Sequence, residues 1–269
     1  MMLARLSKSG GKIVDAILIL AAGKGKRLVP ETLHCPKPFL ELGNVTILER
    51  LLNQFQRYFS GIPIFVNFSY LPHTFLKEVE RIAPSIRPQL LYEESVLGPT
   101  NTVQEFSRLF PKFDDILVIH GDIVVSNPGF ELLSDHCSRT VSNFVVTHLR
   151  ESQLARSCVR LESPSKVKEI IEKSPNHLIH ARNDDGMVLH DVCLSVSGIF
   201  YLKSQMVRQY KLDLPQPISP GLLNFLASEF VLHAWSLKGW RFSIDGHQSW
   251  RLAKEAVVNE RNIDSLETS

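Results

Sequence analysis

The segment Ala16–Leu42, AILILAAGKGKRLVPETLHCPKPFLEL, decides the fold of this chain. Ile13–Ala22 is an apolar run that is too short to cross a bilayer and is followed at once by glycine, which predicts a buried central strand. Gly23 and Gly25 lack a Cβ, so the backbone there can turn sharply, direct successive N–H groups to one point and let an anion approach closely. Basic side chains surround the same turn: Lys24, Lys26, Arg27 and, further on, Lys37. The segment therefore predicts a strand that ends in a polyphosphate-binding loop.

Two common glycine-loop motifs do not fit this segment. The dinucleotide-binding fingerprint G-x-G-x-x-G or A needs a small residue where Leu28 stands, so binding of NAD is not predicted. A P-loop needs four residues between its glycine and a Gly-Lys-Ser/Thr triplet, and no such spacing occurs in the 269 residues.

A different pattern does fit: G-x-G-x-R-L, a short gap, then P-K-P and an apolar run. The matching residues are Gly23, Gly25, Arg27, Leu28, Pro36, Lys37 and Pro38. On these residues the chain resembles the nucleoside-diphosphate-sugar pyrophosphorylases, which are sugar-1-phosphate nucleotidyltransferases. The resemblance implies a Rossmann-like three-layer αβα fold with a mixed, mainly parallel sheet. It also implies Mg²⁺-dependent transfer of a nucleoside monophosphate from a nucleoside triphosphate to a sugar 1-phosphate, with release of pyrophosphate.

Composition is consistent with a single large α/β domain. The chain has 269 residues, of which 44% are hydrophobic, so it can bury a sizeable core. Its 30 basic and 28 acidic residues give a net charge of +2 and are scattered, so neither a nucleic acid nor a membrane is the expected partner. The four cysteines form no C-x-x-C pair and read as reduced thiols. The N-terminus lacks a signal-peptide pattern, and we expect a cytoplasmic protein.

Strand and helix patterns alternate along the chain, which predicts right-handed crossovers and a sheet covered on both faces. Helices are predicted at 44–59, at 73–83, from the segment LGPTNT (97–102) to about 110, at 220–230 and at 248–258. Thr46 and Glu49 form a capping box at the start of the first of these helices. Strands are predicted at 62–68, 86–92, 115–121, 142–150, 157–161, 167–173, 191–202, 231–236 and 240–244. Pro88 places the second of these strands near an edge or a bulge.

The resemblance assigns nucleotide binding to the loop and to a later turn. The residues are Leu20, Ala21, Ala22, Gly23, Lys24, Gly25, Lys26 and Arg27, followed by Gly98 and Thr100 in LGPTNT. Arg27 would hold the β- and γ-phosphates, and Lys37 would neutralise charge that develops at the α-phosphoryl group. The turn around Gly98 matches the family only in part, which leaves the nucleobase open.

Two aspartates are the predicted metal ligands. Asp122 directly follows the apolar strand at 115–121 and so lies at the carboxyl edge of the sheet, where open α/β folds bind ligands. In the family this G-D motif supplies one magnesium ligand, and Asp245 takes the position of the second. The resemblance also implies that Asp122, Arg27 and Lys37 are the catalytic residues. A helix N-cap is another role open to Asp245. His120 is expected to be a packed strand residue, because Mg²⁺ favours oxygen donors.

The acceptor is assigned to a third group of residues. Glu172 and Lys173 stand near a family Glu-Lys-Pro motif whose lysine reaches the phosphate of the sugar 1-phosphate, and Gly198 matches a strand glycine against which the sugar packs. A strand glycine can also mark a bulge.

Other functions remain open beside this one. An enzyme of the same fold could act on phosphocholine or on a cyclitol phosphate, and a silent homologue could serve as a regulatory subunit, although Arg27, Lys37, Asp122 and Asp245 are all present. We expect residues 1–12 to be an N-terminal extension, 13–260 one nucleotidyltransferase domain and 261–269 a C-terminal tail, with no room for an appended left-handed β-helix. A homodimer is a possible assembly.

Overall fold

The computed structural model describes residues 14–151, 157–172, 192–211 and 218–267. They form a central seven-stranded sheet with helices on both sides, as predicted from the alternation of strands and helices. In spatial order the strands are β10 (Leu232–Ser236), β6 (Asn143–Glu151), β9 (Val192–Lys203), β4 (Asp115–His120), β1 (Ala16–Leu20), β2 (Ile64–Phe68) and β3 (Gln89–Tyr92). Within the sheet, β9 runs antiparallel to β4 and β6, while all other neighbours are parallel. The predicted mixed, mainly parallel sheet is confirmed.

The sheet separates two apolar cores. On β1, Ile17 and Ile19 face one core while Ala16 and Leu18 face the other, because successive side chains of a strand point to opposite faces. All four side chains are fully buried. This explains why the predicted strand reads as a continuous apolar run rather than an alternating one.

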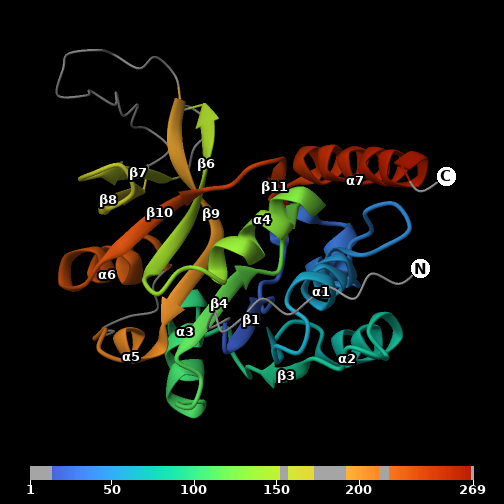
Figure 1. Cartoon of the computed structure of the whole chain (residues 1–269). Coiled ribbons are helices and arrows are strands. Elements are labelled where there is room, and N and C mark those ends of the chain that lie inside the picture. Colours follow the sequence, from blue (N-terminus) through green and yellow to red (C-terminus); the bar gives the residue numbers. More distant parts are fainter. Residues whose placement is uncertain (1–13, 152–156, 173–191, 212–217, 268–269) are drawn as a thin grey trace.

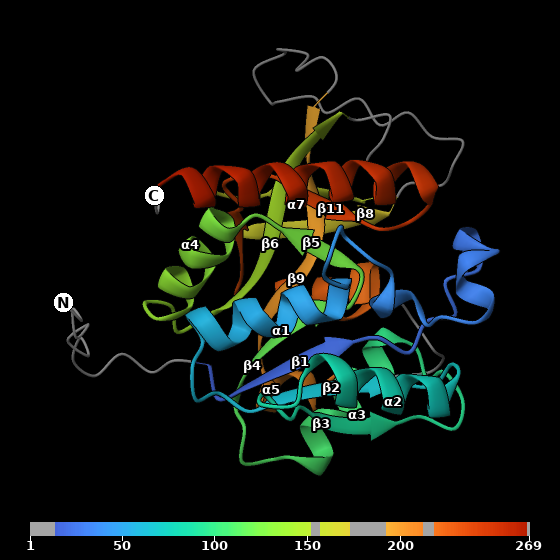
Figure 2. The same cartoon turned by 90° about the vertical axis from the view of Figure 1, so that its right-hand side faces the viewer.

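Helices cover both faces of the sheet (Figures 1 and 2). The first core is covered by α1 (Ile47–Tyr58), α2 (Pro72–Ile82), α4 (Asn127–Cys137) and α7 (His247–Glu267). The second core is covered by α3 (Pro99–Leu109), α5 (Ser204–Val207) and α6 (Leu223–Glu229), which follows an irregular turn at Ile218–Leu222. Two small antiparallel sheets complete the fold: β5 (Ile123–Val125) with β11 (Arg241–Ser243), and β7 (Ser157–Leu161) with β8 (Val167–Glu172).

Several local predictions are confirmed. Thr46 and Glu49 form the reciprocal capping box at the start of α1, and β3, which follows Pro88, is the edge strand. Three helices differ from the prediction: α4 and the short α5 were not predicted, and α7 extends to Glu267 instead of ending at Val258. In the part of the chain that the structure describes, no helix combines the length and apolarity that a membrane span requires.

Candidate active site

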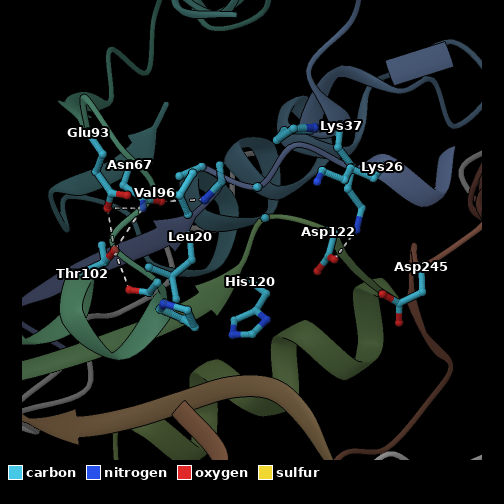
Figure 3. Close-up of a pocket in the computed structure, with 18 of the residues that line it drawn as sticks. Leu20, Lys26, Lys37, Asn67, Glu93, Val96, Thr102, His120, Asp122 and Asp245 are labelled. Atoms are coloured by element: carbon cyan, nitrogen blue, oxygen red, sulfur yellow. Dashed lines mark hydrogen bonds and ion pairs between the residues drawn. The ribbon is translucent and has the colours of Figure 1, made fainter. Parts of the chain in front are cut away.

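A cavity of about 330 Å³ opens at the carboxyl ends of β1, β2, β3 and β4. Leu20, at the end of β1, pairs in register with Asn67 of β2 on one side and with His120 of β4 on the other. Parallel strands thus bring together residues 47 and 100 positions apart at the edge where open α/β sheets bind ligands (Figure 3). Of the predicted nucleotide-binding residues, this cavity is lined by Leu20, Ala21, Ala22, Gly23, Gly25, Lys26, Arg27 and Gly98. Lys24 is exposed and Thr100 is buried in α3, and neither lines the cavity.

The glycine loop needs one glycine for its backbone conformation. Gly25 has a φ of +64°, and a Cβ at this position would lie 3.0 Å from Cγ2 of Thr32 and 3.2 Å from Cβ of Lys37. Its carbonyl oxygen accepts a 3.0 Å hydrogen bond from the Thr32 hydroxyl. This turn leads into the short 3₁₀ turns Lys26–Leu28 and Lys37–Phe39, which carry the basic side chains.

Two ion pairs join the basic loop to the two predicted metal ligands. Nζ of Lys37 lies 2.5 Å from Oδ2 of Asp122, and Nη2 of Arg27 lies 2.8 Å from Oδ1 of Asp245. Burial alone would raise the pKa of the Asp122 carboxyl, but the charge of Lys37, helped by His120 and Arg241, holds that pKa below its usual value. The Lys37 and Asp122 side chains are only 13% and 22% exposed, whereas Arg27 is 60% exposed. The Lys37–Asp122 pair is therefore the better shielded from solvent.

Backbone contacts place the two aspartates side by side. The N–H of Gly121 donates to the carbonyl of Leu20 at 2.8 Å, and a Cβ on Gly121 would lie 3.0 Å from that same oxygen, so the glycine allows the chain to pass close to β1. The N–H of Ile244 donates to the carbonyl of Asp122, which joins the segment before Asp245 to the end of β4.

The donor set at this point suits Mg²⁺. Oδ1 of Asp122 is buried and has no hydrogen-bond partner among the described residues. Buried polar atoms normally have a partner, so this oxygen is a candidate metal ligand. No group of three or more His, Cys, Asp or Glu side chains close enough for a metal occurs in the described residues. Mg²⁺ is commonly bound by one or two carboxylates plus substrate phosphates, and two carboxylates are present here.

The end of the cavity away from the aspartates contains a polar network that the sequence did not reveal. Asn67 Oδ1 accepts from the Ala21 N–H at 2.6 Å, while its Nδ2 donates to Oε1 of Glu93 at 2.7 Å. Oε1 of Glu93 also accepts from the Thr102 hydroxyl at 2.5 Å, and Oε2 accepts from the Leu97 N–H at 3.2 Å. Figure 3 shows Glu93, Asn67 and Thr102 at one end, Asp122 and Asp245 at the other, and His120 between them. The network fixes the turn that leads to Gly98.

A second cavity, also of about 330 Å³, adjoins the first. Both cavities are lined by Arg27, Pro99, His120, Asp122 and Asp245. The second is further lined by the predicted acceptor residues Glu172 and Gly198, and by Ser157, Ser195, Ser219 and Arg241 among others. Lys173 lies outside the described residues. The predicted phosphate, metal and acceptor positions are thus brought together at one junction.

Gly198 and His120 form one wall of this second cavity. Gly198 has a φ of +75° where the pairing of β6 with β9 shifts register, so it does mark a bulge. A Cβ there would lie 3.2 Å from Ile123 Cδ1 and 3.5 Å from the His120 ring. The expectation that His120 is packed is confirmed in part, because its Nε2 is buried, yet its side chain also lines both cavities.

An open, mainly parallel sheet with a glycine loop, basic side chains and paired carboxylates at its carboxyl edge is typical of α/β proteins that bind phosphate-bearing ligands. Residues 16–219 match the family model described as nucleotidyl transferase, and the chain belongs to that family.

Curated relatives show the same relationship at low identity. The bifunctional protein GlmU of Methanococcus maripaludis is 31% identical over 174 residues, which are 62% of this chain and 39% of the relative. The mannose-1-phosphate guanyltransferase of Aspergillus fumigatus is 24% identical over 229 residues, which are 83% of this chain and 58% of the relative. The chain thus spans about two fifths to three fifths of the length of these relatives.

A solved structure shares the fold. HddC from Yersinia pseudotuberculosis superposes with a TM-score of 0.68 at 19% identity, over 90% of this chain and 99% of that one. The likeness extends over nearly the whole of both chains and confirms the Rossmann-like fold class.

Proposed function

We propose that this protein transfers a nucleoside monophosphate from a nucleoside triphosphate to a sugar 1-phosphate, giving a nucleoside-diphosphate sugar and pyrophosphate. The observation that carries the proposal is the junction of the two cavities. One cavity begins at the glycine loop, the other at Gly198, and they meet where Lys37 pairs with Asp122 and Arg27 with Asp245. Membership of the nucleotidyl transferase family, and a relative named for guanyl transfer to mannose 1-phosphate, support this reading.

The reaction needs positioned charge more than a side-chain nucleophile. A phosphate oxygen of the acceptor attacks the α-phosphorus in line, the bond from that phosphorus to the bridging oxygen breaks, and pyrophosphate leaves with the electron pair. The loop N–H groups and Arg27 would hold the β- and γ-phosphates, and Lys37 would face the α-phosphate, where negative charge increases. For this, Lys37 has to exchange its contact with Asp122 for one with the triphosphate.

Asp122 and Asp245 would hold Mg²⁺. When bound, the ion supplies Lewis-acid stabilisation and a template for the phosphates. The buried Oδ1 of Asp122 is the oxygen best prepared for this role, since no described residue donates a hydrogen bond to it.

The lining of the second cavity favours a polyhydroxylated acceptor over phosphocholine. A quaternary ammonium group is typically bound by an aromatic cage. Among the described residues, Phe200 and the imidazole of His120 are the only aromatic rings that line this cavity, alongside four serines, Ser157, Ser195, Ser219 and Ser243. Hydroxyl groups suit the donors and acceptors of a sugar or cyclitol ring.

The test is pyrophosphate release in the presence of Mg²⁺. Five triphosphates (ATP, GTP, CTP, UTP and dTTP) are combined with glucose, mannose and galactose 1-phosphates, inositol 1-phosphate and phosphocholine. We expect release with one triphosphate and a sugar 1-phosphate, and none from an Asp122→Asn variant. Release with phosphocholine alone would replace the proposed acceptor. Triphosphate binding without release for any acceptor would support a silent homologue.

A further inference from the structure

The second cavity, which we call the acceptor cavity, has a cation of its own. We call the first cavity, which the glycine loop lines, the nucleotide cavity. Arg241 lines the acceptor cavity but not the nucleotide cavity, whereas Arg27 lines both. Arg241 lies on β11, where it pairs with Val125 of β5, four residues before Asp245. Its position therefore separates it from the glycine loop that would hold the β- and γ-phosphates.

Neighbouring groups hold the Arg241 guanidinium in a defined orientation. Nε and Nη2 donate to the carbonyl oxygen of Ser197 at 3.0 and 2.7 Å, and Nη1 lies 3.4 Å from Nε2 of His148. The other ring nitrogen of His148 lies 2.9 Å from the Ser197 hydroxyl. Ser197 directly precedes Gly198, so the bulge of β9 both shapes the cavity wall and orients the guanidinium. A group held in this way is preorganised for a ligand.

The charge of Arg241 acts at the junction of the two cavities. Arg241 lines the acceptor cavity together with His120, Asp122 and Asp245, which are among the residues at which the two cavities meet. Its guanidinium therefore places positive charge in the part of the acceptor cavity that borders the predicted metal site.

We propose that Arg241 binds an anionic group of the acceptor, either its phosphate or a further acidic substituent on its ring. This inference rests on the proposed transferase function. A planar guanidinium with several N–H donors matches phosphate and carboxylate geometry. The family resemblance implied that Lys173 binds the phosphate. Arg241, from a different strand, is a second cation for the acceptor, and sequence spacing does not indicate it.

The test separates acceptor binding from nucleotide binding. Arg241→Gln keeps a planar polar group and removes the charge, and Arg241→Lys keeps the charge. The control is Arg160→Gln, because Arg160 is an exposed residue of β7 that pairs with Glu169 and lines neither cavity. With mannose 1-phosphate or the active sugar 1-phosphate as probe, we expect Arg241→Gln to raise the acceptor KM at least 10-fold. The triphosphate KM should change less than 2-fold, and Arg241→Lys should recover part of the loss.

A second set of probes identifies the anion. Glucuronic acid 1-phosphate is compared with glucose 1-phosphate, since the two differ by one carboxylate. A KM increase of equal size for both assigns Arg241 to the phosphate, whereas an increase confined to the uronic acid assigns it to a substituent. A KM unchanged for both probes, or equal losses for acceptor and triphosphate together with a lower Tm, would make Arg241 structural and overturn the proposal.

Direct binding provides a readout that does not depend on turnover. The ¹⁵Nε signal of Arg241, assigned by its absence in Arg241→Lys, should shift when glucose 1-phosphate or glucuronic acid 1-phosphate is added to the wild type. A signal that stays in place at saturating probe overturns the inference even if Arg241→Gln fails to fold. If no triphosphate and acceptor pair gives pyrophosphate but this signal shifts, the proposed reaction fails while the anion site stands.

Discussion

At the residue scale, the positive charge of Lys37 is balanced by the carboxylate of Asp122 when no ligand is bound. Lys37 pairs with Asp122 at 2.5 Å, yet the reaction needs its charge at the α-phosphate. We expect Lys37→Ala to lower kcat about 100-fold or more, as is typical when one preorganised donor is removed from a transition state. The matched control is Lys77→Ala, which removes an exposed lysine of α2. Near-normal turnover in Lys37→Ala would remove this residue from the mechanism.

Glu93 places a carboxylate at the far end of the nucleotide cavity. Guanine presents adjacent N1–H and N2–H₂ donors, whereas uracil presents one N–H between two acceptors, so the carboxylate favours guanine. We expect the wild type to prefer GTP to UTP, and Glu93→Gln to lower the ratio of kcat/KM for GTP over UTP about 10-fold, within the usual discrimination of a paired contact. Glu94→Gln, at the exposed neighbouring position, is the control. A preference that survives Glu93→Gln would place base selection elsewhere.

The low pKa of Asp122 has a consequence for stability. A carboxyl whose folded pKa is depressed contributes stability above its unfolded pKa of about 3.9, and this contribution is lost as pH falls through the folded value. We therefore expect Asp122→Asn to remain folded but to be less stable than wild type by about 1–3 kcal/mol at pH 7. The difference should begin to shrink as pH falls to about 4, where the carboxyl of the unfolded chain becomes protonated, and should be lost as pH falls through the lower folded pKa. The measurement is the Tm of both proteins from pH 7 to pH 3. If the Tm difference between wild type and Asp122→Asn stayed constant over this range, the ion pair with Lys37 would not be the source of the stability difference.

The sequence predicted the candidate site residues that stand at short spacing in one motif and missed those that only packing brings to the site. Arg27, Lys37 and Asp122 stand at fixed distances from glycines or prolines, and the structure brings them together. Glu93 joins Asn67 because β2 and β3 are neighbours in the large sheet, and Arg241 reaches Ser197 of β9 from β11, a strand of the separate small sheet. No periodicity encodes such pairs, and Lys173 remains a prediction.

At the scale of elements, α7 is fixed to the rest of the fold by a buried ion pair. Nη2 of Arg50 on α1 lies 2.6 Å from Oε2 of Glu260, and Oε1 of Glu260 accepts from the N–H of Asn127 at the start of α4. Both charged side chains are less than 10% exposed, at 7% and 9%. Because α7 begins two residues after Asp245, this contact also bears on the predicted metal site.

Removing one partner of that pair leaves a buried, uncompensated charge. We expect Glu260→Gln to lower the free energy of unfolding by about 3 kcal/mol. Glu255→Gln on the same helix should cost less than about 0.5 kcal/mol, because Glu255 is exposed and lies 3.9 Å from the exposed Arg251. Urea titration of both variants gives the comparison. Equal stability losses would show that the buried pair does not anchor α7.

Hydrophobic pattern predicted most elements because the sheet is buried on both faces and the helices are amphipathic. It missed α4, because Pro128 and Gly129 in its first turn read as a loop in the sequence. The helix forms nevertheless, since proline is favoured in a first turn and the Ser126 hydroxyl accepts a 3.2 Å hydrogen bond from the Gly129 N–H. It ended α7 too early because Glu260, in a polar stretch, is buried by its contact with Arg50 rather than by apolar character. Tertiary ion pairing is invisible to periodicity.

At the scale of the whole molecule, the two ion pairs connect distant parts of the chain. Arg27 and Lys37 come from the first loop, Asp122 follows β4, and Asp245 precedes the last helix. In the free protein each predicted metal ligand is neutralised by a predicted phosphate-binding cation. A metal ion alone would have to compete with Lys37, and a triphosphate alone with Asp122. Together they replace both partners at once, which predicts that metal and triphosphate bind cooperatively.

Thermal unfolding measures this coupling without turnover. A ligand at about 100 times its Kd stabilises the folded state by about 2.7 kcal/mol, which corresponds to a Tm increase of about 5–10 °C for a chain of this size. We expect that increase with Mg²⁺ and the preferred triphosphate together, and only a small one with either alone. In Lys37→Ala, Mg²⁺ alone should raise Tm more than in the wild type, because Asp122 has lost its competing cation, while Lys77→Ala should behave as wild type. If Mg²⁺ alone had the same effect on Lys37→Ala and wild type, the Lys37–Asp122 pair would not limit access of a cation to the carboxylate, and the cooperativity would have to arise from the metal–triphosphate complex itself.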